Sequence, residues 1–201
     1  MTRTRSTVLG FGDSLTAGTP GYDPEYGGDV RYQYGHWLAE LARTDEHEVE
    51  FVNRGVPGDL AATMPSRLEN EMTRGRYDCV IILAGTNDLG WGALPEEVLR
   101  RLSVLWDIVA AHDVPLVTCT LPPVGFLDPG LQDHRARVNR GVLAAPLARN
   151  RCVAVDIFSH LADADGLLVE TYDSGDGLHL SIEGYRVLGE TLWREGVRRI
   201  L

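Results

Sequence analysis

Five short apolar runs recur along the chain, separated by longer segments in which apolar residues repeat at helical spacing. The runs occupy residues 7–11, 49–53, 79–85, 115–121 and 152–158. They are rich in valine and isoleucine and mostly lack alternation with polar residues, which is typical of strands covered on both faces. The pattern therefore predicts five strands of a buried sheet.

The amphipathic segments between and after these runs predict helices, at residues 33–42, 59–75, 95–113, 131–150 and 181–201. The second of them opens with Asp59, a good helix cap, and contains Pro65, which we expect to kink or break the helix. Alternating strands and helices predict an open, mostly parallel α/β sheet with helices on both faces. Ligands of such sheets bind beyond the carboxyl ends of the strands.

The organisation along the chain is simple. No internal repeat, linker or low-complexity segment interrupts the pattern, so residues 1–201 are predicted to form a single domain. Two long loops, residues 16–32 and 122–131, follow the first and fourth strands at their carboxyl ends. We expect these loops to determine the choice of substrate.

Composition and charge narrow the classes of partner. The chain is 44% hydrophobic and 24% charged, as in ordinary globular proteins, and its net charge of −10 disfavours nucleic acid and anionic membrane surfaces. No apolar run approaches the ~18 residues of a membrane span, and the first apolar run is too short for a signal peptide. We therefore expect no integral membrane association and a cytoplasmic location. These features do not predict an oligomeric state.

The sequence does not predict a metal or cofactor site. Cys79, Cys119 and Cys152 lie in strand-like runs, and an odd number without CxxC spacing argues against disulfides or a zinc site. We expect them to be small buried hydrophobic residues. A flavin- or nucleotide-binding module is the non-enzymatic alternative for such a sheet. The first strand-to-helix turn, GDSLTAG, lacks both the GxGxxG and the GxxxxGK[ST] phosphate loops, so no cofactor is predicted.

A serine and a histidine at opposite ends of the chain are candidates for catalysis. Ser14 follows the first strand on a glycine-flanked turn, where it is either a helix cap or a nucleophile that needs a base. Asp176 precedes His179 by three residues in DGLH, so its carboxylate could hold one ring nitrogen and leave the other free as a base. The alternative is that this pair merely stabilises a loop.

Two further turns could stabilise a developing negative charge. Asn87 follows the third strand in AGTND, where its amide could donate to an oxyanion. Gly58 lies in NRGVPGD after the second strand, where its backbone amide could point outward at a helix N-terminus. The backbone amide of Ser14 is a third donor. Each motif alone is also ordinary turn chemistry.

Together these motifs carry a resemblance. FGDSLT, GVPGD, GTND and DGLH occur in the order and at the spacing of four characteristic blocks of the SGNH hydrolases, the GDSL-type esterases and lipases, so the chain resembles that family over residues 10–180. The resemblance implies a three-layer α/β/α, flavodoxin-like sandwich whose five-stranded parallel sheet has the order 2-1-3-4-5. It implies Ser14 as nucleophile, His179 as general base and Asp176 as the residue that orients it.

The resemblance also implies an oxyanion hole made of the Ser14 and Gly58 amides and the Asn87 side chain. Gly55 is the less favoured alternative to Gly58. The implied activity is that of a serine esterase that acts on a small-molecule ester without metal or cofactor. We expect short-acyl esters, because the chain has little room for a lid and no large amphipathic lipid-binding helix.

The sequence leaves several activities and substrate classes open. Thioesterase, carbohydrate O-deacetylase, lysophospholipase and acyltransferase activities would use the same site. Besides these enzymes and the flavin- or nucleotide-binding module, the remaining alternative is a catalytically inactive scaffold. Asp13 and Trp91 are candidate substrate-binding residues. Several aromatic residues of the first long loop and the helix after it could wall an acyl pocket or stack on a sugar, or could pack the first helix on the sheet: Tyr22, Tyr26, Tyr32, Tyr34 and Trp37.

Overall fold

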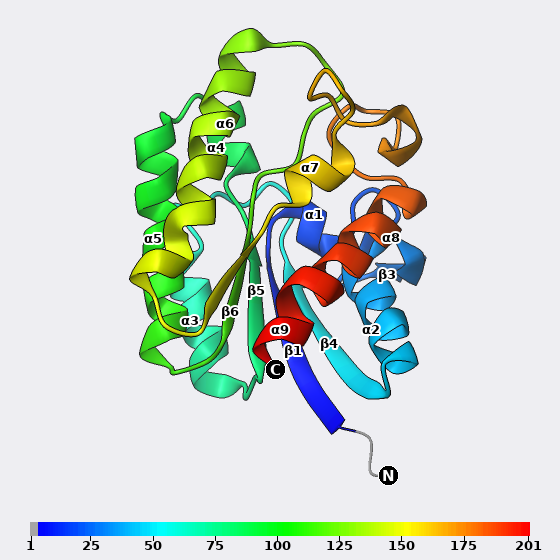
Figure 1. Ribbon diagram of the computed structural model, residues 1–201, viewed down its shortest axis with the longest axis vertical. Coiled ribbons are helices and arrows are strands. Elements are labelled where there is room, and N and C mark those ends of the chain that lie inside the picture. The colour runs from blue at the N-terminus through cyan, green and yellow to red at the C-terminus, as the bar shows by residue number, and fades with distance from the viewer. Residues whose placement is uncertain (1–3) are drawn as a thin grey trace.

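The computed structural model describes residues 4–201, which form a five-stranded sheet between two layers of helices (Figure 1). The strands are β1 (Thr4–Gly12), β4 (His47–Gly55), β5 (Cys79–Leu83), β6 (Leu116–Cys119) and β7 (Cys152–Val155). They are all parallel and lie in the order β4-β1-β5-β6-β7. Counted along the chain, this is the order 2-1-3-4-5, so the expected fold is confirmed.

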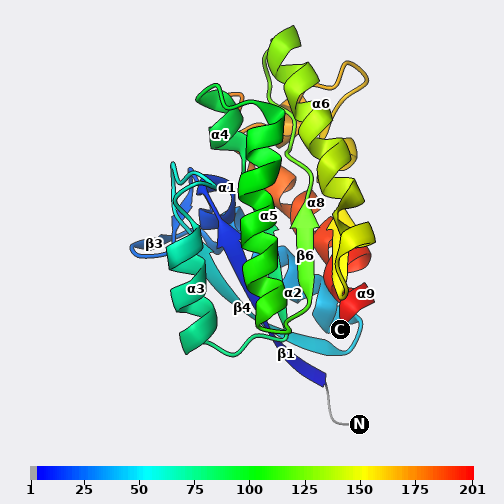
Figure 2. The same ribbon diagram turned by 90° about the vertical axis from the view of Figure 1, so that its left-hand side faces the viewer.

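Helices cover both faces of the sheet (Figure 2). One face is covered by α2 (Tyr34–Thr44) and α8 (Ile182–Thr191), and the other by α3 (Pro65–Arg74), α5 (Pro95–Ala111) and α6 (Pro129–Ala144). A π-helical turn (Leu192–Val197) and α9 (Arg198–Ile200) continue α8. Three short helices follow strand ends, namely α1 (Ser14–Ala17), α4 (Thr86–Gly90) and α7 (Ile157–Leu161).

The two long loops are only partly irregular. The first contains a small antiparallel hairpin, β2 (Tyr22–Asp23) with β3 (Gly27–Gly28), and a 3₁₀ turn (Val30–Tyr32). Two further 3₁₀ turns lie at Ala145–Ala148 and Glu170–Tyr172. The second loop, after β6, ends at Pro129, where α6 begins two residues earlier than expected.

The start of α3 corrects a prediction. The helix begins at Pro65 and not at Asp59, so the expected helix over 59–75 is wrong in its first part. The Asp59 carboxylate accepts a hydrogen bond from the Leu60 amide at 3.0 Å and pairs with Arg67 at 2.8 Å, which holds residues 59–64 in a turn. Proline has no N–H and a helical φ, so Pro65 fits the first turn of a helix and does not kink it.

The carboxyl ends of three neighbouring strands lie level with one another. Gly12, the last residue of β1, pairs with Gly55 of β4 and with Leu83 of β5. A Cβ atom at Gly12 would lie 2.0 Å from the Leu83 carbonyl oxygen, so only glycine fits there. The loops after β1, β4 and β5 therefore emerge side by side.

The aromatic residues after β1 divide between packing and exposure. Tyr34 is fully buried, Tyr32 packs edge-on against Tyr185 at 6.1 Å, and the Trp37 indole N–H donates to a backbone carbonyl at 2.8 Å. Packing therefore accounts for these three residues. Tyr26, in contrast, is 83% exposed on the hairpin.

Two further expectations concern the burial of the three cysteines and the presence of a membrane-spanning helix. Cys79 and Cys119 are buried as expected, whereas Cys152 at the edge strand is only partly buried. Within residues 4–201, no helix is long and apolar enough to cross a membrane.

Candidate active site

Ser14 and His179 meet at the carboxyl edge of the sheet. Ser14 is the first residue of α1, directly after β1, and His179 lies in the loop that precedes α8. Ser14 Oγ lies 3.0 Å from His179 Nε2, and Asp176 Oδ2 lies 2.6 Å from His179 Nδ1. The structure thus brings the three expected catalytic side chains into one hydrogen-bonded series.

The loop around Asp176 fixes the imidazole. Asp176 Oδ1 accepts the backbone amides of Leu178 and His179, at 2.9 and 2.8 Å, while the Ser174 amide donates to the His179 carbonyl at 2.9 Å. Partial burial raises the pKa of Asp176, but the hydrogen bonds from His179 and Leu178 outweigh it and bring the pKa down to about 2. The carboxylate is therefore ionised over the ordinary pH range and able to accept a hydrogen bond from Nδ1–H.

Asp13 lies beneath the serine turn. It is 1% exposed, and its Oδ1 accepts the Leu15 amide at 3.0 Å, which caps α1. Its Oδ2 is buried without a hydrogen-bond partner among the described residues. Burial, with smaller contributions from the charges of Asp88 and Asp59, raises the pKa of Asp13 to about 7. This burial favours a supporting role for Asp13 over the direct substrate contact expected from the sequence.

The candidate oxyanion donors follow the carboxyl ends of β1, β4 and β5, which lie side by side. Asn87 Nδ2 donates one hydrogen to the Asp59 carbonyl at 3.0 Å, which ties the side chain to the loop that contains Gly58 and leaves its second N–H free. Gly58 is exposed and has φ +78°, a conformation that favours glycine. The Gly55 amide already donates to Asn53 Oδ1 at 2.9 Å, which favours Gly58 of the two.

Arg67 joins the loops of this site, a role that the sequence did not predict. Its guanidinium donates to the Gly12 carbonyl at 3.1 Å and to the Arg54 carbonyl at 2.6 Å, and it pairs with Asp59 at 2.8 Å. It also stacks over the Phe11 ring at 3.9 Å. One side chain of α3 therefore holds the ends of β1 and β4 and the turn after Gly58 together.

Asp88 supports the neighbouring turn. Its side chain is fully buried, accepts the Ala61 amide at 2.9 Å and pairs with Arg101 at 2.7 Å. These bonds fix α4, which carries Asn87, against the turn over residues 59–64. Only its position directly after Asn87 in the TND motif could have indicated this role from the sequence.

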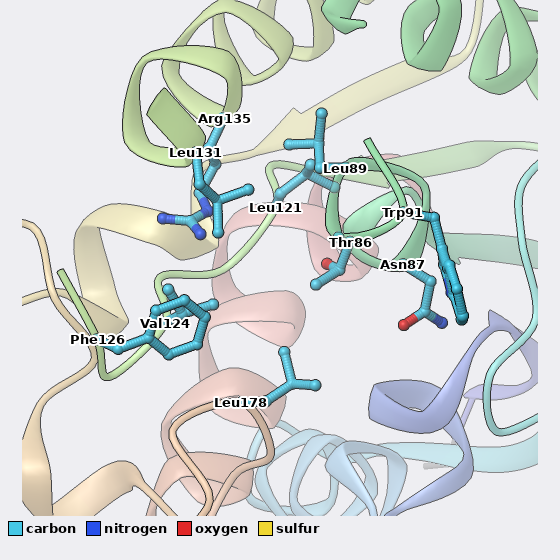
Figure 3. A pocket seen from close by; sticks show the side chains of 11 residues that line it. Thr86, Asn87, Leu89, Trp91, Leu121, Val124, Phe126, Leu131, Arg135 and Leu178 are labelled. Atoms are coloured by element: carbon cyan, nitrogen blue, oxygen red, sulfur yellow. The ribbon is translucent and has the colours of Figure 1, made fainter. Parts of the chain in front are cut away.

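A cavity of about 240 Å³ opens beside the candidate oxyanion hole (Figure 3). Asn87 and Leu178, the neighbour of His179, belong to its wall, and Trp91, 83% exposed, lies on the same side as Asn87. Most of the remaining lining is apolar: Leu89, Gly90, Leu121, Val124, Phe126 and Leu131, with Thr86 and Arg135. The side chains of residues 131 and 135 enter from α6. The loop after β6 and the start of α6 thus border the candidate site.

Across residues 4–201, no group of three histidine, cysteine or acidic side chains is arranged to hold a metal ion. A serine hydroxyl, an imidazole and a carboxylate in hydrogen-bonded series, beside amide donors, form the arrangement that serine hydrolases use for acyl transfer.

The chain belongs to the GDSL-like lipase/acylhydrolase family, whose model matches residues 11–187, and it is a hydrolase of ester bonds. No curated protein sequence gives a match. Among solved structures, a family 3 carbohydrate esterase from Clostridium thermocellum is similar with a TM-score of 0.78 and 21% identity, over 98% of each chain.

Two further solved structures share the fold. TesA is similar with a TM-score of 0.77 and 19% identity, over 97% of this chain and 99% of its own. A variant of Axe2, an acetyl-xylooligosaccharide esterase from Geobacillus, gives a TM-score of 0.75 and 20% identity, over 97% of this chain and 96% of its own.

Proposed function

We propose that this hydrolase is a serine esterase that cleaves small short-acyl carboxylic esters through an acyl-enzyme on Ser14. The observation that carries the proposal is one hydrogen-bonded series of three side chains. Ser14 Oγ lies 3.0 Å from His179 Nε2, and His179 Nδ1 lies 2.6 Å from Asp176 Oδ2. These are the distances at which a base can take the serine proton and a carboxylate can orient that base.

In the first half of the reaction, Ser14 Oγ attacks the ester carbonyl carbon while His179 Nε2 takes its proton. The carbonyl oxygen becomes an oxyanion held by the Ser14 and Gly58 amides and by the free N–H of Asn87. The C–O bond to the alcohol then breaks, and the alcohol leaves with the proton from His179. Asp176 stabilises the imidazolium without becoming protonated.

In the second half, water attacks the acyl-enzyme carbonyl and gives a proton to His179. The same three donors hold the second oxyanion, the bond to Ser14 Oγ breaks, and the proton returns to that oxygen. The products are a carboxylic acid and a regenerated serine.

The size of the cavity supports small substrates. Its volume of about 240 Å³ lies below the ~300–1,000 Å³ of typical drug-sized pockets. The wall is formed largely by leucine, valine and phenylalanine side chains. We therefore expect acetyl and butyryl esters to react faster than long-chain esters.

A carbohydrate O-deacetylase is the second candidate. Trp91 stands 83% exposed beside Asn87, where an indole can stack on a sugar ring. Two of the similar structures are a carbohydrate esterase and a variant of an acetyl-xylooligosaccharide esterase. Release of acetate from acetylated oligosaccharides, with a loss in the Trp91→Ala variant that simple aryl acetates do not show, would favour this candidate.

Labelling with a fluorophosphonate tests the nucleophile. The reagent should modify one peptide, the one that contains Ser14, and Ser14→Ala should lose both labelling and ester hydrolysis. Ser66→Ala, which removes an exposed hydroxyl from α3, is the matched control and should keep both. Ester hydrolysis that survives in folded Ser14→Ala would contradict the proposal.

A panel of p-nitrophenyl esters of increasing acyl length tests the substrate class. Acetyl and butyryl esters should give the highest kcat/KM. A maximum at dodecanoyl or longer esters would contradict the short-acyl proposal while leaving the nucleophile unchanged.

A further inference from the structure

One arginine is buried in the wall of the cavity. Arg135 of α6 is 3% exposed, and its Nη1 has no hydrogen-bond partner in the described part of the chain. Figure 3 shows its guanidinium extending from α6 toward the interior of the cavity, from the side opposite Asn87 and Trp91. The guanidinium and the candidate oxyanion hole therefore border the same space.

No carboxylate neutralises this guanidinium. Arg135 takes part in no ion pair with another residue in the range 4–201, although the sequence contains 29 acidic residues. Asp128 is the acidic residue whose charge acts on it, but the Asp128 carboxylate caps α6 by accepting the Leu131 amide at 2.9 Å. Burial lowers the pKa of Arg135, yet a guanidinium stays protonated in proteins. The fold thus buries a cation without a counterion, which is costly.

Other polar atoms nearby are also without partners. Thr86 Oγ1, beside Asn87 in the same wall, and Gln132 Nε2, one turn before Arg135 on α6, are both buried without a partner among residues 4–201. Gln132 lines a second cavity, which Arg135 also borders, whereas Thr86 and Arg135 both line the cavity beside Asn87. Buried polar atoms are nearly always hydrogen-bonded, so the unpartnered Thr86 Oγ1 and Arg135 Nη1 in this one wall point to a ligand that satisfies them. The guanidinium nitrogen carries only N–H donors and a positive charge, and the threonine hydroxyl can also donate, so the chemistry that matches both is an anion.

Apolar side chains separate the polar ends of the cavity. Leu121, Val124, Leu131 and Leu178 line the space between the Asn87 side and Arg135. A molecule that fills it would have a reacting ester at one end, a short apolar middle, and an anionic group at the other end.

We propose that the ester substrates of this enzyme carry a carboxylate, separated from the ester by a short aliphatic spacer, and that Arg135 binds this carboxylate. The inference rests on the proposed esterase function and specifies its substrate class. Arg135 would be a specificity-determining residue that leaves the chemical steps at Ser14 unchanged. A planar guanidinium can bind a carboxylate through two parallel N–H donors, which suits it to this role.

Matched pairs of esters test the charge preference on each side of the ester bond. On the acyl side, monoethyl adipate is compared with ethyl hexanoate, which has the same length and no charge. On the alcohol side, pentanoate with a terminal acetoxy group is compared with pentyl acetate. At least one anionic ester should have a kcat/KM about 10- to 100-fold above that of its neutral partner, the range of a hydrogen-bonded charge. The pair that responds identifies the side that carries the carboxylate.

Variants test whether Arg135 is the cause. Arg135→Met should lower kcat/KM for the anionic ester far more than for its neutral partner and so remove the preference, while Arg135→Lys should keep part of it. Arg140→Met removes an exposed positive charge from the same helix and should keep the full preference. Adipate should inhibit the parent competitively and Arg135→Met weakly.

The outcomes separate this inference from the proposed function. Equal kcat/KM within both ester pairs, or a preference that persists in Arg135→Met, would overturn the role of Arg135, while hydrolysis of neutral esters by a labelled Ser14 would keep the esterase. Loss of labelling and of all ester hydrolysis in the parent would instead overturn the esterase. Arg135→Met removes an unpaired buried charge, so it should fold, and its unfolding temperature at or above that of the parent checks this.

Discussion

His179 Nε2 lies 3.0 Å from Ser14 Oγ, although 165 positions separate the two residues along the chain. Ser14 follows β1, which lies inside the sheet between β4 and β5, and His179 lies in the loop before α8, which packs on the face of that sheet. Asp176 fixes the imidazole from the other side, because its Oδ2 lies 2.6 Å from His179 Nδ1 and its Oδ1 accepts the His179 backbone amide at 2.8 Å. The contact therefore depends on a rigid sheet and on one well-braced loop.

Asp176→Ala should lower kcat less than Ser14→Ala does. The imidazole keeps its place as a base but loses its orienting carboxylate, so the loss should stay within the ~10²–10⁴-fold that a positioned base contributes. Rates for a p-nitrophenyl ester measure this, with Asp133→Asn, an exposed carboxyl on α6, as the control. An Asp176→Ala enzyme as fast as the parent would show that the Asp176–His179 pair only stabilises the loop.

Asn87→Ala should lower kcat by about 10²–10³-fold with little change in KM, because the lost N–H acts on the oxyanion and not on the ground-state ester. Asn87→Asp should be at least as impaired, since a carboxylate of the same shape cannot donate. Asn70→Ala, an exposed amide on α3, should behave as the parent. A loss confined to KM would place Asn87 in substrate binding instead.

Arg67→Met should lower kcat by roughly 10- to 100-fold while the protein stays folded, because small displacements of reacting groups are costly. Arg67 holds the Gly12 carbonyl and Asp59, so its loss frees the loop that carries the Gly58 amide. Steady-state kinetics should show the loss mainly in kcat, with a smaller change in KM. Arg74→Met, on the exposed side of the same helix, is the control, and equal kcat in the two variants would reject the positioning role.

Asp13→Asn should change how stability depends on pH. In the folded protein the pKa of Asp13 is raised to about 7 by burial, against 3.8 for the ordinary group. Between these values the unfolded chain ionises and the folded chain does not. The free energy of unfolding of the parent should therefore fall as pH rises through this window, by up to ~1.4 kcal/mol per pH unit from this group.

Asparagine keeps the Oδ1 acceptor for the Leu15 amide but does not ionise. Urea unfolding from pH 4 to 8 should thus show that the free energy of unfolding of Asp13→Asn increases relative to that of the parent as pH rises. Asp133→Asn should follow the parent at every pH, and an Asp13→Asn difference that stays flat across the window would contradict the raised pKa.

The strands could be predicted because they leave a local signal in the sequence, and the motifs of the proposed site could be recognised for the same reason. The runs at residues 79–85 and 115–121 contain β5 and β6, since buried parallel strands are continuously apolar. The helix start at Asp59 was predicted wrongly because its carboxylate pairs with Arg67, eight residues later, and closes a turn instead of capping a helix. A capping residue looks the same in the sequence whichever partner it finds.

The supporting residues of the site could not be predicted. Arg67, Asp88 and Arg135 are charged residues in or beside amphipathic helices, and the sequence favours solvent exposure for such positions. Their roles depend on which backbone carbonyls, amides and cavities lie opposite them, and only packing decides that. The GDSL-type resemblance leads to a proposal for the reacting groups but not for the residues that hold them.

The separation of Ser14 from its base has a consequence for biosynthesis. The ribosome makes Ser14 165 residues before it makes His179, the base in the proposed mechanism. On this proposal, a chain that has not yet reached residue 179 carries a Ser14 hydroxyl no more reactive than that of an ordinary alcohol. Under the proposed mechanism, acyl-transfer chemistry therefore begins only once His179 has been made and lies beside Ser14.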